Sequence, residues 1–327
     1  AARIILSGHS DRDLILKSVR SAHQYLAKPC DSRTLQATIA RALALRSLLG
    51  DSALIGLVSG IETLPSAPAI YREMIEELNS PAASIPKVAG IISKDVGMTA
   101  KILQLANSAF FGLYQHVNTM ERALTLLGID TVVALVLTVH IFTPPSRSLA
   151  PGFSISALWN HSMATAFAAK AIAREEKQDR ADMEDAFMGG LIHDVGKLVL
   201  ATNLAESYGG VITRVREFDC PLWIAEQDVL GTTHAAVGAY LMGVWGIPDR
   251  IVEAIAFHHS PMSCPDQAFS PLTAVHAGNA LVQAEQAGGK PKASEALDMH
   301  YLARLGLTER LALWSSATRK VQQQAKG

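Results

Sequence analysis

The sequence predicts a mainly α-helical protein that begins with a short segment of alternating strands and helices. From residue 54 onward, apolar residues recur at helical spacing, Gly and Pro mark the turns, and no period-two strand pattern is convincing. Before residue 47, two short aliphatic runs are each followed by a helical pattern. With 327 residues, the chain is long enough for a large core and for two domains.

The first 46 residues predict two strands and two helices. The strands are expected at residues 3–7 and 23–27, with the first helix at residues 11–21 between them. The pair Asp31-Ser32 then caps a second helix. Two strands are too few for a stable α/β domain of this size, so we expect the segment to be part of a larger unit.

The helical part is divided by residues that favour helix starts. One helix is expected from Ser66, or a proline near it, to Leu78. A second is expected after Ser84, with Pro86 in its first turn, and a third after Asp95. A stretch rich in Pro and Ser later separates this upper helical half from a half that carries most of the histidines.

Composition and charge exclude several classes of protein. The longest apolar run, residues 132–142, is about half of the ~20 residues that a membrane-spanning helix needs, so it predicts a buried core helix. The net charge of −1 gives no indication of nucleic-acid binding. The three cysteines form no Cys-x-x-Cys pair, which argues against a disulfide framework and a thiolate zinc site. No secretion leader is recognised, so we expect a cytoplasmic protein without membrane or nucleic-acid partners.

The adjacent residues His193 and Asp194 are the most informative feature of the chain. They lie in the run Gly-Gly-Leu-Ile-His-Asp-Val-Gly-Lys-Leu, which is otherwise apolar and is predicted to be helical. Burying an imidazole together with a carboxylate is costly, and metal coordination is one arrangement that compensates both groups. Further histidines lie in the same part of the chain: His161, His234, His258, His259 and His276. Such nitrogen and oxygen ligands suit iron, manganese, zinc or nickel, and the spacing does not choose among them.

Five separated motifs occur in one order along the chain. They are Leu-Pro-Ser-Ala-Pro from residue 64, Ile-Ser-Lys-Asp-Val-Gly-Met-Thr from residue 92, Leu-Ala-Asn-Ser-Ala-Phe-Phe-Gly from residue 105, Ala-Leu-Thr-Leu-Leu-Gly-Ile from residue 123, and the run around His193. In this order they resemble the HDOD domain, an output module related to HD-type phosphohydrolases. The resemblance implies an all-helical HD-like domain at residues 57–262, preceded by a linker at residues 47–56. Residues 263–327 are then expected to form a helical extension that packs on this domain.

Active HD phosphohydrolases and HD-GYP phosphodiesterases share a pattern of metal ligands, and this chain is similar to it. The residues that match the first histidine, the His-Asp doublet, the next histidine and the HD-GYP histidine pair are, in order, His161, His193 and Asp194, His234, and His258 with His259. The resemblance therefore implies a site for one or two divalent transition-metal ions. Lys197 would contact a substrate phosphate if the protein is an enzyme.

The chain departs from that pattern at two places. Asn279 stands where a late aspartate is expected, and an amide is a weaker ligand. Ser260-Pro261 replaces the acidic residue and the Gly-Tyr-Pro signature of the HD-GYP group. Both departures argue against phosphodiesterase activity. The sequence also allows a purely structural explanation, in which His193 and Asp194 form a hydrogen-bonded pair without metal and Lys197 extends to solvent.

Two motifs near the N-terminus match the last strands of one known kind of domain. Ile-Ile-Leu-Ser-Gly-His-Ser begins at residue 4, and Tyr-Leu-Ala-Lys-Pro-Cys-Asp begins at residue 25. They resemble the end of the receiver domain of bacterial response regulators, in which Ser7 would follow the phosphorylation state. Lys28 would contact the phosphoryl group, and Pro29 would follow a cis peptide bond. Because the acidic pair and the phospho-accepting aspartate are missing, residues 1–46 are expected to be a partial receiver domain.

Together, these resemblances favour a cytoplasmic output module of a two-component response regulator. Such a module binds a signalling protein or a small signalling ligand, and it could retain the metal site. The alternative is a metal-dependent phosphohydrolase that acts on a nucleotide or a cyclic dinucleotide. The sequence leaves open which of the two applies, and it leaves a homo-oligomer open as the form of assembly.

Overall fold

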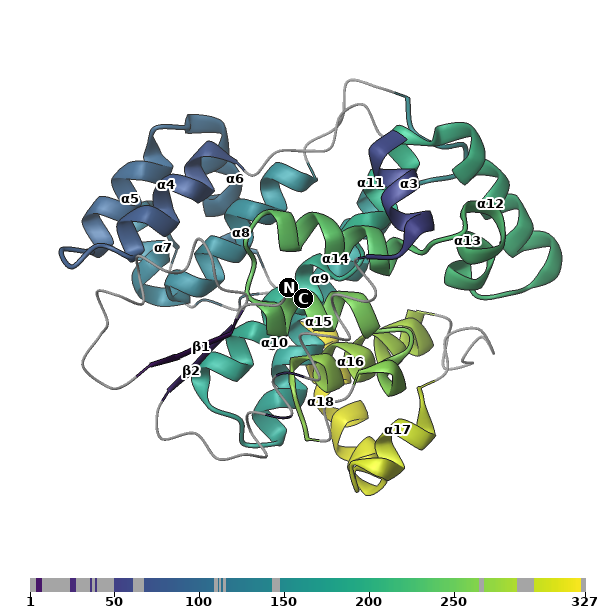
Figure 1. Cartoon of the computed structure of the whole chain (residues 1–327). Helices are drawn as coiled ribbons and strands as arrows, with labels where there is room; N and C mark the ends of the chain where they lie inside the picture. The colour runs from purple at the N-terminus through teal and green to yellow at the C-terminus, as the bar shows by residue number, and fades with distance from the viewer. Residues whose placement is uncertain are drawn as a thin grey trace.

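The computed structural model describes residues 4–7, 24–27, 36, 39, 50–60, 68–108, 111, 113, 116–142, 148–264, 268–286 and 297–324, and these residues are mainly helical (Figure 1). The α-helices of the first part are α3 (Ser52–Gly60), α4 (Ala69–Leu78), α5 (Ile85–Ser93), α6 (Val96–Ala106), α7 (Met120–Leu127) and α8 (Ile129–Ile141). Those of the second part are α9 (Ile155–Glu175), α10 (Arg180–Ile192), α11 (Val195–Asn203), α12 (Ala205–Phe218), α13 (Leu222–Leu230), α14 (His234–Val244), α15 (Asp249–Phe257), α16 (Pro271–Gln286), α17 (Met299–Arg304) and α18 (Leu311–Gln324). Two short 3-10 helices, Pro261–Ser263 and Thr308–Arg310, complete the helical elements.

The helices from α4 to α8 form one group, on the left of Figure 1. Their starts agree with the residues that favour helix starts: α5 begins directly after Ser84, and the Asp95 carboxylate accepts a hydrogen bond of 2.9 Å from the backbone N–H of Met98 in α6. All nine residues of α8 from position 131 to 139 are buried. The expected core helix is therefore present, and it packs against both α6 and α10.

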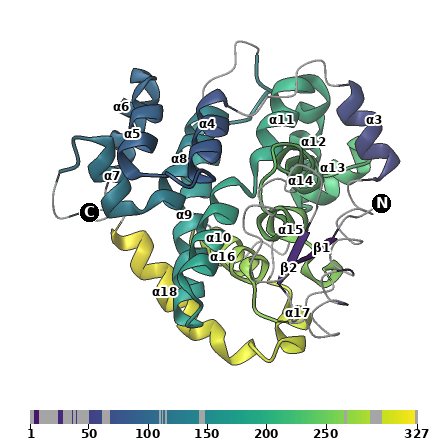
Figure 2. The same cartoon turned by 60° about the vertical axis from the view of Figure 1, so that its left-hand side comes forward.

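The second group is built on α9, a helix of 21 residues. Helices α10, α16 and α18 pack against it, as the two views in Figures 1 and 2 show. The segment expected as a C-terminal extension thus contacts the rest of the molecule through α16 and α18. Helices α11 and α14 pack together, and α15 lies against α14 and α10.

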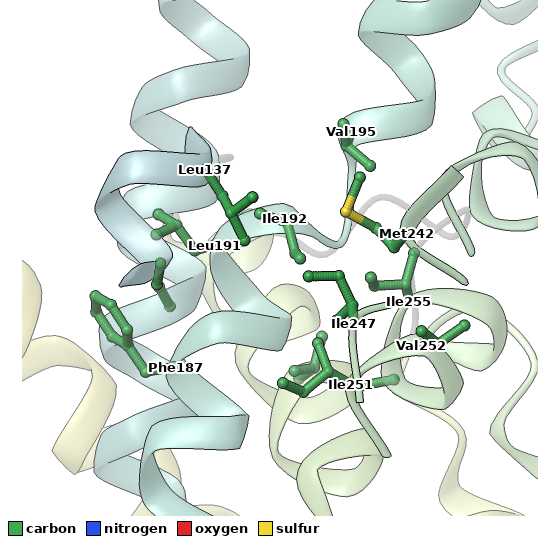
Figure 3. Close-up of a cluster of buried hydrophobic side chains, with 14 of the residues drawn as sticks. Leu137, Phe187, Leu191, Ile192, Val195, Met242, Ile247, Ile251, Val252 and Ile255 are labelled. Atoms are coloured by element: carbon green, nitrogen blue, oxygen red, sulfur yellow. The ribbon is translucent and has the colours of Figure 1, made fainter. Parts of the chain in front are cut away.

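One large apolar core cluster runs through both groups of helices. Figure 3 shows side chains from five helices in one cluster: Leu137, Phe187, Leu191, Ile192, Val195, Met242, Ile251, Val252 and Ile255. Two of them, Ile192 and Val195, are almost completely buried and directly flank His193 and Asp194. Because burial of such side chains stabilises the fold by roughly 1.5–3 kcal/mol each, the polar pair between them is held firmly in place.

Two short strands precede the helices. Strands β1 (Ile4–Ser7) and β2 (Gln24–Ala27) pair in parallel, with Ile4 opposite Gln24 and Ser7 opposite Ala27. They agree with the expected strand positions, whereas the helix expected at residues 11–21, together with Lys28 and Pro29, lies outside the described residues. The receiver fragment is therefore not shown by the structure. Helix α3 begins inside the stretch assigned as a linker, residues 47–56.

A helix that spans a membrane must be both long and apolar. Within the described part of the chain, no single helix combines the length and apolarity needed to cross a membrane. Helices α7 and α8 reach that length together, but they meet at a bend of 118°. Since α8 is buried inside the protein, its apolar composition is explained by packing.

Candidate metal centre

The pair His193-Asp194 lies at a break between two helices. Helix α10 ends at Ile192 and α11 begins at Val195, so the prediction of a continuous helical run is wrong here. The ring of His193 donates a hydrogen bond of 2.8 Å from Nδ1 to the carbonyl oxygen of Gly190, in the last turn of α10. A side chain therefore closes this helix end, and the break turns both polar side chains toward the interior.

Two glycines bring this break close to neighbouring helices. A Cβ atom on Gly190 would lie 2.7 Å from Cα of Ala166 in α9. A Cβ atom on Gly196 would lie 1.9 Å from the carbonyl oxygen of His234, the first residue of α14. Glycine lowers the helix propensity at both positions, but it allows neighbouring helices to approach closely. This close approach places Asp194 near the helices that carry His161 and His234.

Three buried histidines present the same ring nitrogen to one region. Nδ1 of His193 faces the carbonyl oxygen of Gly190, and Nδ1 of His258 faces that of Ile255, each at 2.8 Å. Nδ1 of His234 lies 2.6 Å from Oε2 of a buried glutamate. Because these oxygens can only accept, Nδ1 carries the proton in all three rings. Each Nε2 then points toward Asp194. Those of His193 and His258 have no hydrogen-bond partner, whereas that of His234 lies 3.1 Å from Nε2 of His259.

Asp194 is the common neighbour of these nitrogens. Its Oδ1 lies 3.2 Å from Nε2 of His234 and 3.7 Å from Nε2 of His258. Its Oδ2 lies 3.3 Å from Nε2 of His193 and 3.8 Å from Nε2 of His161. A carboxylate surrounded by imidazole nitrogens is a donor set that transition-metal ions favour.

Three atoms of this centre are buried without a hydrogen-bond partner. They are Nε2 of His193, Nε2 of His258 and Oδ1 of Asp194. Buried polar groups are normally paired, and a lost partner costs about 1–3 kcal/mol per group. A cation coordinated by these atoms would compensate all three at once, so the residues present fit a metal ion.

The centre consists of two overlapping groups of side chains that could each hold a metal ion. In each group the ligand atoms lie within 4.8 Å of one another. The first group is Asp194, His234, His258 and His259, and the second is His161, His193 and Asp194. The structure thus brings together all six residues that the sequence proposed as metal ligands. It also shows how consecutive histidines reach one site, because α15 ends at Phe257, immediately before His258.

His161 is bonded differently from the other histidines. Its Nε2 lies 2.9 Å from the amide oxygen of Asn279, and an amide oxygen can only accept, so this Nε2 carries a proton. Asn279 is the residue that the sequence comparison placed at a lost aspartate. It lies beside His161, and its amide oxygen occupies the ring nitrogen that a metal would need.

Glu226 is an important residue that the sequence analysis missed. It is completely buried, and its Oε2 accepts hydrogen bonds from Nδ1 of His234 at 2.6 Å and from the backbone N–H of the same residue at 2.8 Å. Its Oε1 accepts a bond of 2.8 Å from the hydroxyl of Tyr208. Such a carboxylate fixes the orientation and tautomer of a histidine ligand. Helical spacing gave one signal for it, since Glu226 lies four residues after the apolar Leu222 and therefore shares its helix face.

Two further predicted residues have clear positions. Nζ of Lys197 lies 2.7 Å from Oδ2 of Asp194, so the lysine is inside the centre and does not extend freely to solvent. His276 donates from Nδ1 to the carbonyl oxygen of His258 at 2.7 Å and accepts a bond of 2.9 Å from the backbone N–H of Asp298. With both ring nitrogens occupied, His276 has a structural role.

Burial and neighbouring charges shift the pKa values of the centre in opposite directions. Burial alone would raise the pKa of Asp194, but His193 and Lys197 beside it hold that pKa well below its usual value. Burial lowers the pKa of His161 to about 4. The pKa of His258 and that of His259 also lie well below the usual value because both rings are buried. For His234, burial is outweighed by the negative charge of Glu226, which raises the pKa. The carboxylate is thus ionised and most rings are neutral, as metal ligation requires.

Solved structures of three other proteins share the fold. An HDOD domain protein from Geobacter sulfurreducens gives a TM-score of 0.68 at 23% identity, over 85% of this chain and 95% of that one. A candidate phosphohydrolase from Shewanella amazonensis SB2B gives 0.61 at 22% identity, over 85% and 99%. A candidate signal transduction protein from Marinobacter aquaeolei VT8 gives 0.60 at 20% identity, over 95% and 71%.

Sequence comparison agrees with the structural likeness. An uncharacterised protein of Treponema pallidum (strain Nichols) is 25% identical over 213 residues, which is 65% of this chain. The chain spans 40% of the length of that relative. The family model for the HDOD domain matches residues 64–261, which is more than half of the chain and includes the residues from His161 to His259. This chain therefore belongs to the HDOD domain family.

Proposed function

We propose that this protein is a cytoplasmic signal-transduction output module that holds one or two divalent transition-metal ions at the Asp194 centre. The observation that carries the proposal is the convergence of three buried atoms without hydrogen-bond partners, Nε2 of His193, Nε2 of His258 and Oδ1 of Asp194. The contacts between Asp194 and the histidines, at 3.2 Å or longer, leave these three atoms without a hydrogen-bond partner. The proposed metal accounts for all of them.

The residues of the chain supply specific parts of this site. Glu226, together with the carbonyl groups of Gly190 and Ile255, holds three imidazole rings in one tautomer. Asp194 belongs to both groups of ligands, so it would help to hold a metal ion in either group. Lys197 balances part of the charge of Asp194. A bound metal of this kind acts as a Lewis acid or as a fixed positive charge for an anionic group.

A regulatory role is favoured over hydrolysis by the bonding of His161. The amide of Asn279 occupies Nε2 of this ring at 2.9 Å, where a hydrolase of this pattern would place a carboxylate ligand. The proposed input is a receiver domain, of which residues 1–46 would be the last part. The parallel pairing of β1 and β2 supports this assignment, because the last strands of a receiver run parallel. The output is binding of a signalling protein or a small ligand.

Hydrolysis of a phosphoester is the second candidate function. Two ligand groups that share one carboxylate are the arrangement that two-metal phosphohydrolases use. Lys197 lies within the centre, where it could contact a substrate phosphate. The Shewanella amazonensis protein of similar fold is described as a candidate phosphohydrolase, although at 22% identity this likeness concerns the fold alone.

One experiment separates these functions. The protein is purified without chelator, its transition-metal content is measured by elemental analysis, and turnover is assayed on a panel of phosphoesters that includes nucleotides and cyclic dinucleotides. We expect bound metal without turnover. Protein that stays free of metal after incubation with Fe²⁺, Mn²⁺, Zn²⁺ and Ni²⁺ would contradict the metal site. Metal-dependent turnover that Asp194→Asn abolishes would establish the hydrolase instead.

A further inference from the structure

A cavity of about 550 Å³ adjoins the metal centre. Its walls come from four elements: Leu54 in α3, Trp223 and Gln227 in α13, the first turn of α14, and Phe257 at the end of α15. This volume is in the range of small-molecule binding sites, which is about 300–1,000 Å³. The cavity is therefore large enough for a compound with two or three rings.

The cavity opens onto one specific edge of the centre. His259 lines it and belongs to the ligand group of Asp194, His234 and His258. The other three members of that group are almost completely buried, whereas His259 is partly exposed. A compound in the cavity would therefore meet the centre at His259.

The lining residues define the chemistry of a ligand. The half-buried indole of Trp223 lies nearly parallel to the ring of His259, with an interplanar angle of 19° and centroids 6.1 Å apart. Flat aromatic surfaces of this kind stack on planar rings. Hydroxyl and amide groups surround them, from Thr232, Thr233, Ser260, Ser263 and Gln227. These groups can pair with donors and acceptors at the edge of a heteroaromatic ring.

The charges of the lining residues restrict the class of ligand further. Among the described residues that line it, Asp51 is the one carboxylate, and none is a lysine or an arginine. Among the lining residues only His259 belongs to the metal centre, so a ligand that carries several negative charges would find no compensating cation over the rest of these walls. The walls therefore suit a planar ring system without net charge.

Helix α3 closes one side of the cavity. Leu54 is completely buried, whereas its neighbour Ile55 is 45% exposed. A Cβ atom on Gly231 would lie 3.5 Å from Cβ of Ala53, so α3 packs on the turn between α13 and α14. Figures 1 and 2 both show α3 beside α13. The same helix follows the N-terminal segment, which makes it the physical connection between that segment and the cavity.

We infer that this cavity binds a planar, uncharged heteroaromatic compound against Trp223, with α3 as the wall that tightens around it. The inference rests on the proposed function, since it assigns the site of the small ligand. The ring of the ligand stacks on the indole, and its polar edge faces the threonine and serine hydroxyls. Binding of the ligand and packing of α3 then stabilise each other.

Calorimetric titration of the full chain tests this assignment. The probes are adenosine and guanosine for purines, riboflavin for flavins, and ribose as a control without an aromatic ring. We expect binding of purines or of riboflavin, which identifies the source of the ring, and no binding of ribose. Trp223→Ala should weaken the bound probe about tenfold or more, because stacking on one aromatic side chain contributes about 1–3 kcal/mol. Ile224→Ala is the matched control and should leave affinity unchanged. Failure of all three aromatic probes, or equal binding by Trp223→Ala, overturns the inference.

The role of α3 has its own readout. Leu54→Ala should weaken the same probe several-fold, whereas Ile55→Ala on the exposed face of α3 should not. In the unaltered protein, the probe should slow amide hydrogen exchange in residues 52–60, so the test does not depend on whether Leu54→Ala folds. Unchanged exchange in this helix overturns α3 as the closing wall.

Metal content measured on the same samples separates this inference from the proposed function. Bound metal without binding of any aromatic probe overturns the cavity assignment and leaves the metal centre standing. Binding of a probe to protein that never takes up metal supports the cavity and overturns the metal centre.

Discussion

The two sides of Asp194 differ in what holds their histidines, although both offer imidazole nitrogens to the same carboxylate. On the Glu226 side, which comprises His234, His258 and His259, a buried carboxylate fixes the ring of His234 with Nε2 toward the centre, 3.1 Å from Nε2 of His259. On the Asn279 side, which comprises His161 and His193, the amide of Asn279 takes the Nε2 atom of His161 at 2.9 Å. The partners of the ligands therefore decide which side is ready for a metal.

The identity of the ligand residues is only part of what makes a metal site; the partners of those ligands matter as well. A histidine with its Nδ1 bonded to an acceptor offers Nε2 to a metal without rearrangement. A histidine whose Nε2 is bonded to a residue outside the ligand set, as His161 is to Asn279, must first break that bond. We therefore expect the first metal ion on the Glu226 side, with the Asn279 side occupied weakly or only at high metal concentration.

Removing the shared carboxylate should have the largest effect, because it affects both sides. Asp194→Asn is expected to abolish metal binding altogether, as measured by elemental analysis after gel filtration. Asp228→Asn is the control, since Asp228 forms only an exposed ion pair with Arg214 at 2.8 Å. Full metal content in Asp194→Asn would show that the metal lies elsewhere.

Removing one histidine from each side should distinguish the sides directly. His234→Ala is expected to lower the affinity for Mn²⁺ or Zn²⁺ by about 100-fold or more, and His161→Ala by less than about tenfold. The reason is that the ring of His161 is already bonded to Asn279. Titration calorimetry gives both affinities. Equal losses of metal affinity in the two variants would contradict the proposed difference between the two sides of Asp194.

Glu226 is expected to act on the metal through His234. Glu226→Gln should lower metal affinity about 10–100-fold while the protein stays folded, because the amide holds the ring less firmly. Asp228→Asn, on the same helix and exposed, serves again as the control. If Glu226→Gln bound metal as tightly as the unaltered chain, the pre-organisation of the Glu226 side would be wrong.

The stability of the metal-free protein should depend on pH in a predictable direction. The pKa of His161 falls from 6.5 to about 4 on burial, and those of His258 and His259 also fall. The unfolded chain therefore binds these protons more tightly, so their contribution is present above pH 6.5 and is lost as the pH falls toward about 4. For His161 alone the loss is about 3 kcal/mol.

His234 works against this trend. Its pKa is raised, so its contribution is complete below its ordinary pKa and is lost as the pH rises through the raised value. Because three rings with lowered pKa outweigh one with raised pKa, the melting temperature of metal-free protein should fall as the pH drops from 6.5 to about 4. A melting temperature that rises over this interval would contradict the assignment.

The smallest effect is expected from strengthening the weaker side. Asn279→Asp places a carboxylate beside His161, so the bound metal should increase from about one toward two ions per chain. Elemental analysis and the second step of a calorimetric titration measure this change. Unchanged stoichiometry at saturating metal would mean that Asn279 does not limit the second site.

Most ligands of the centre could be predicted from the sequence, because histidine and aspartate are unusual residues within an apolar segment. His193 and Asp194 stand out among Leu, Ile and Val, and the other histidines follow in the order of a known pattern. Glu226 could not be singled out in the same way. It stands beside Gln227 and Asp228, which are exposed, and its burial arises from packing against Tyr208 of a different helix.

The helix boundaries show the same limit of prediction from sequence, which detects local signals but not contacts between distant residues. The start of α6 was predictable because Asp95 caps it through a local hydrogen bond to Met98. The break between α10 and α11 was not, because no proline or polar run marks it and the ring of His193 closes the helix end. The packing of α3 on the turn at Gly231 likewise depends on contacts between residues distant in sequence, so α3 began inside an expected linker.

The central claim is that a metal ion binds first on the Glu226 side of Asp194. Crystals of protein purified without chelator, soaked in one equivalent of Zn²⁺ and measured at the zinc absorption edge, test it most directly. The account predicts one strong anomalous peak about 2.0–2.2 Å from Nε2 of His234, Nε2 of His258 and Oδ1 of Asp194. A peak beside His161 and His193 instead, or no peak near Asp194, would contradict it.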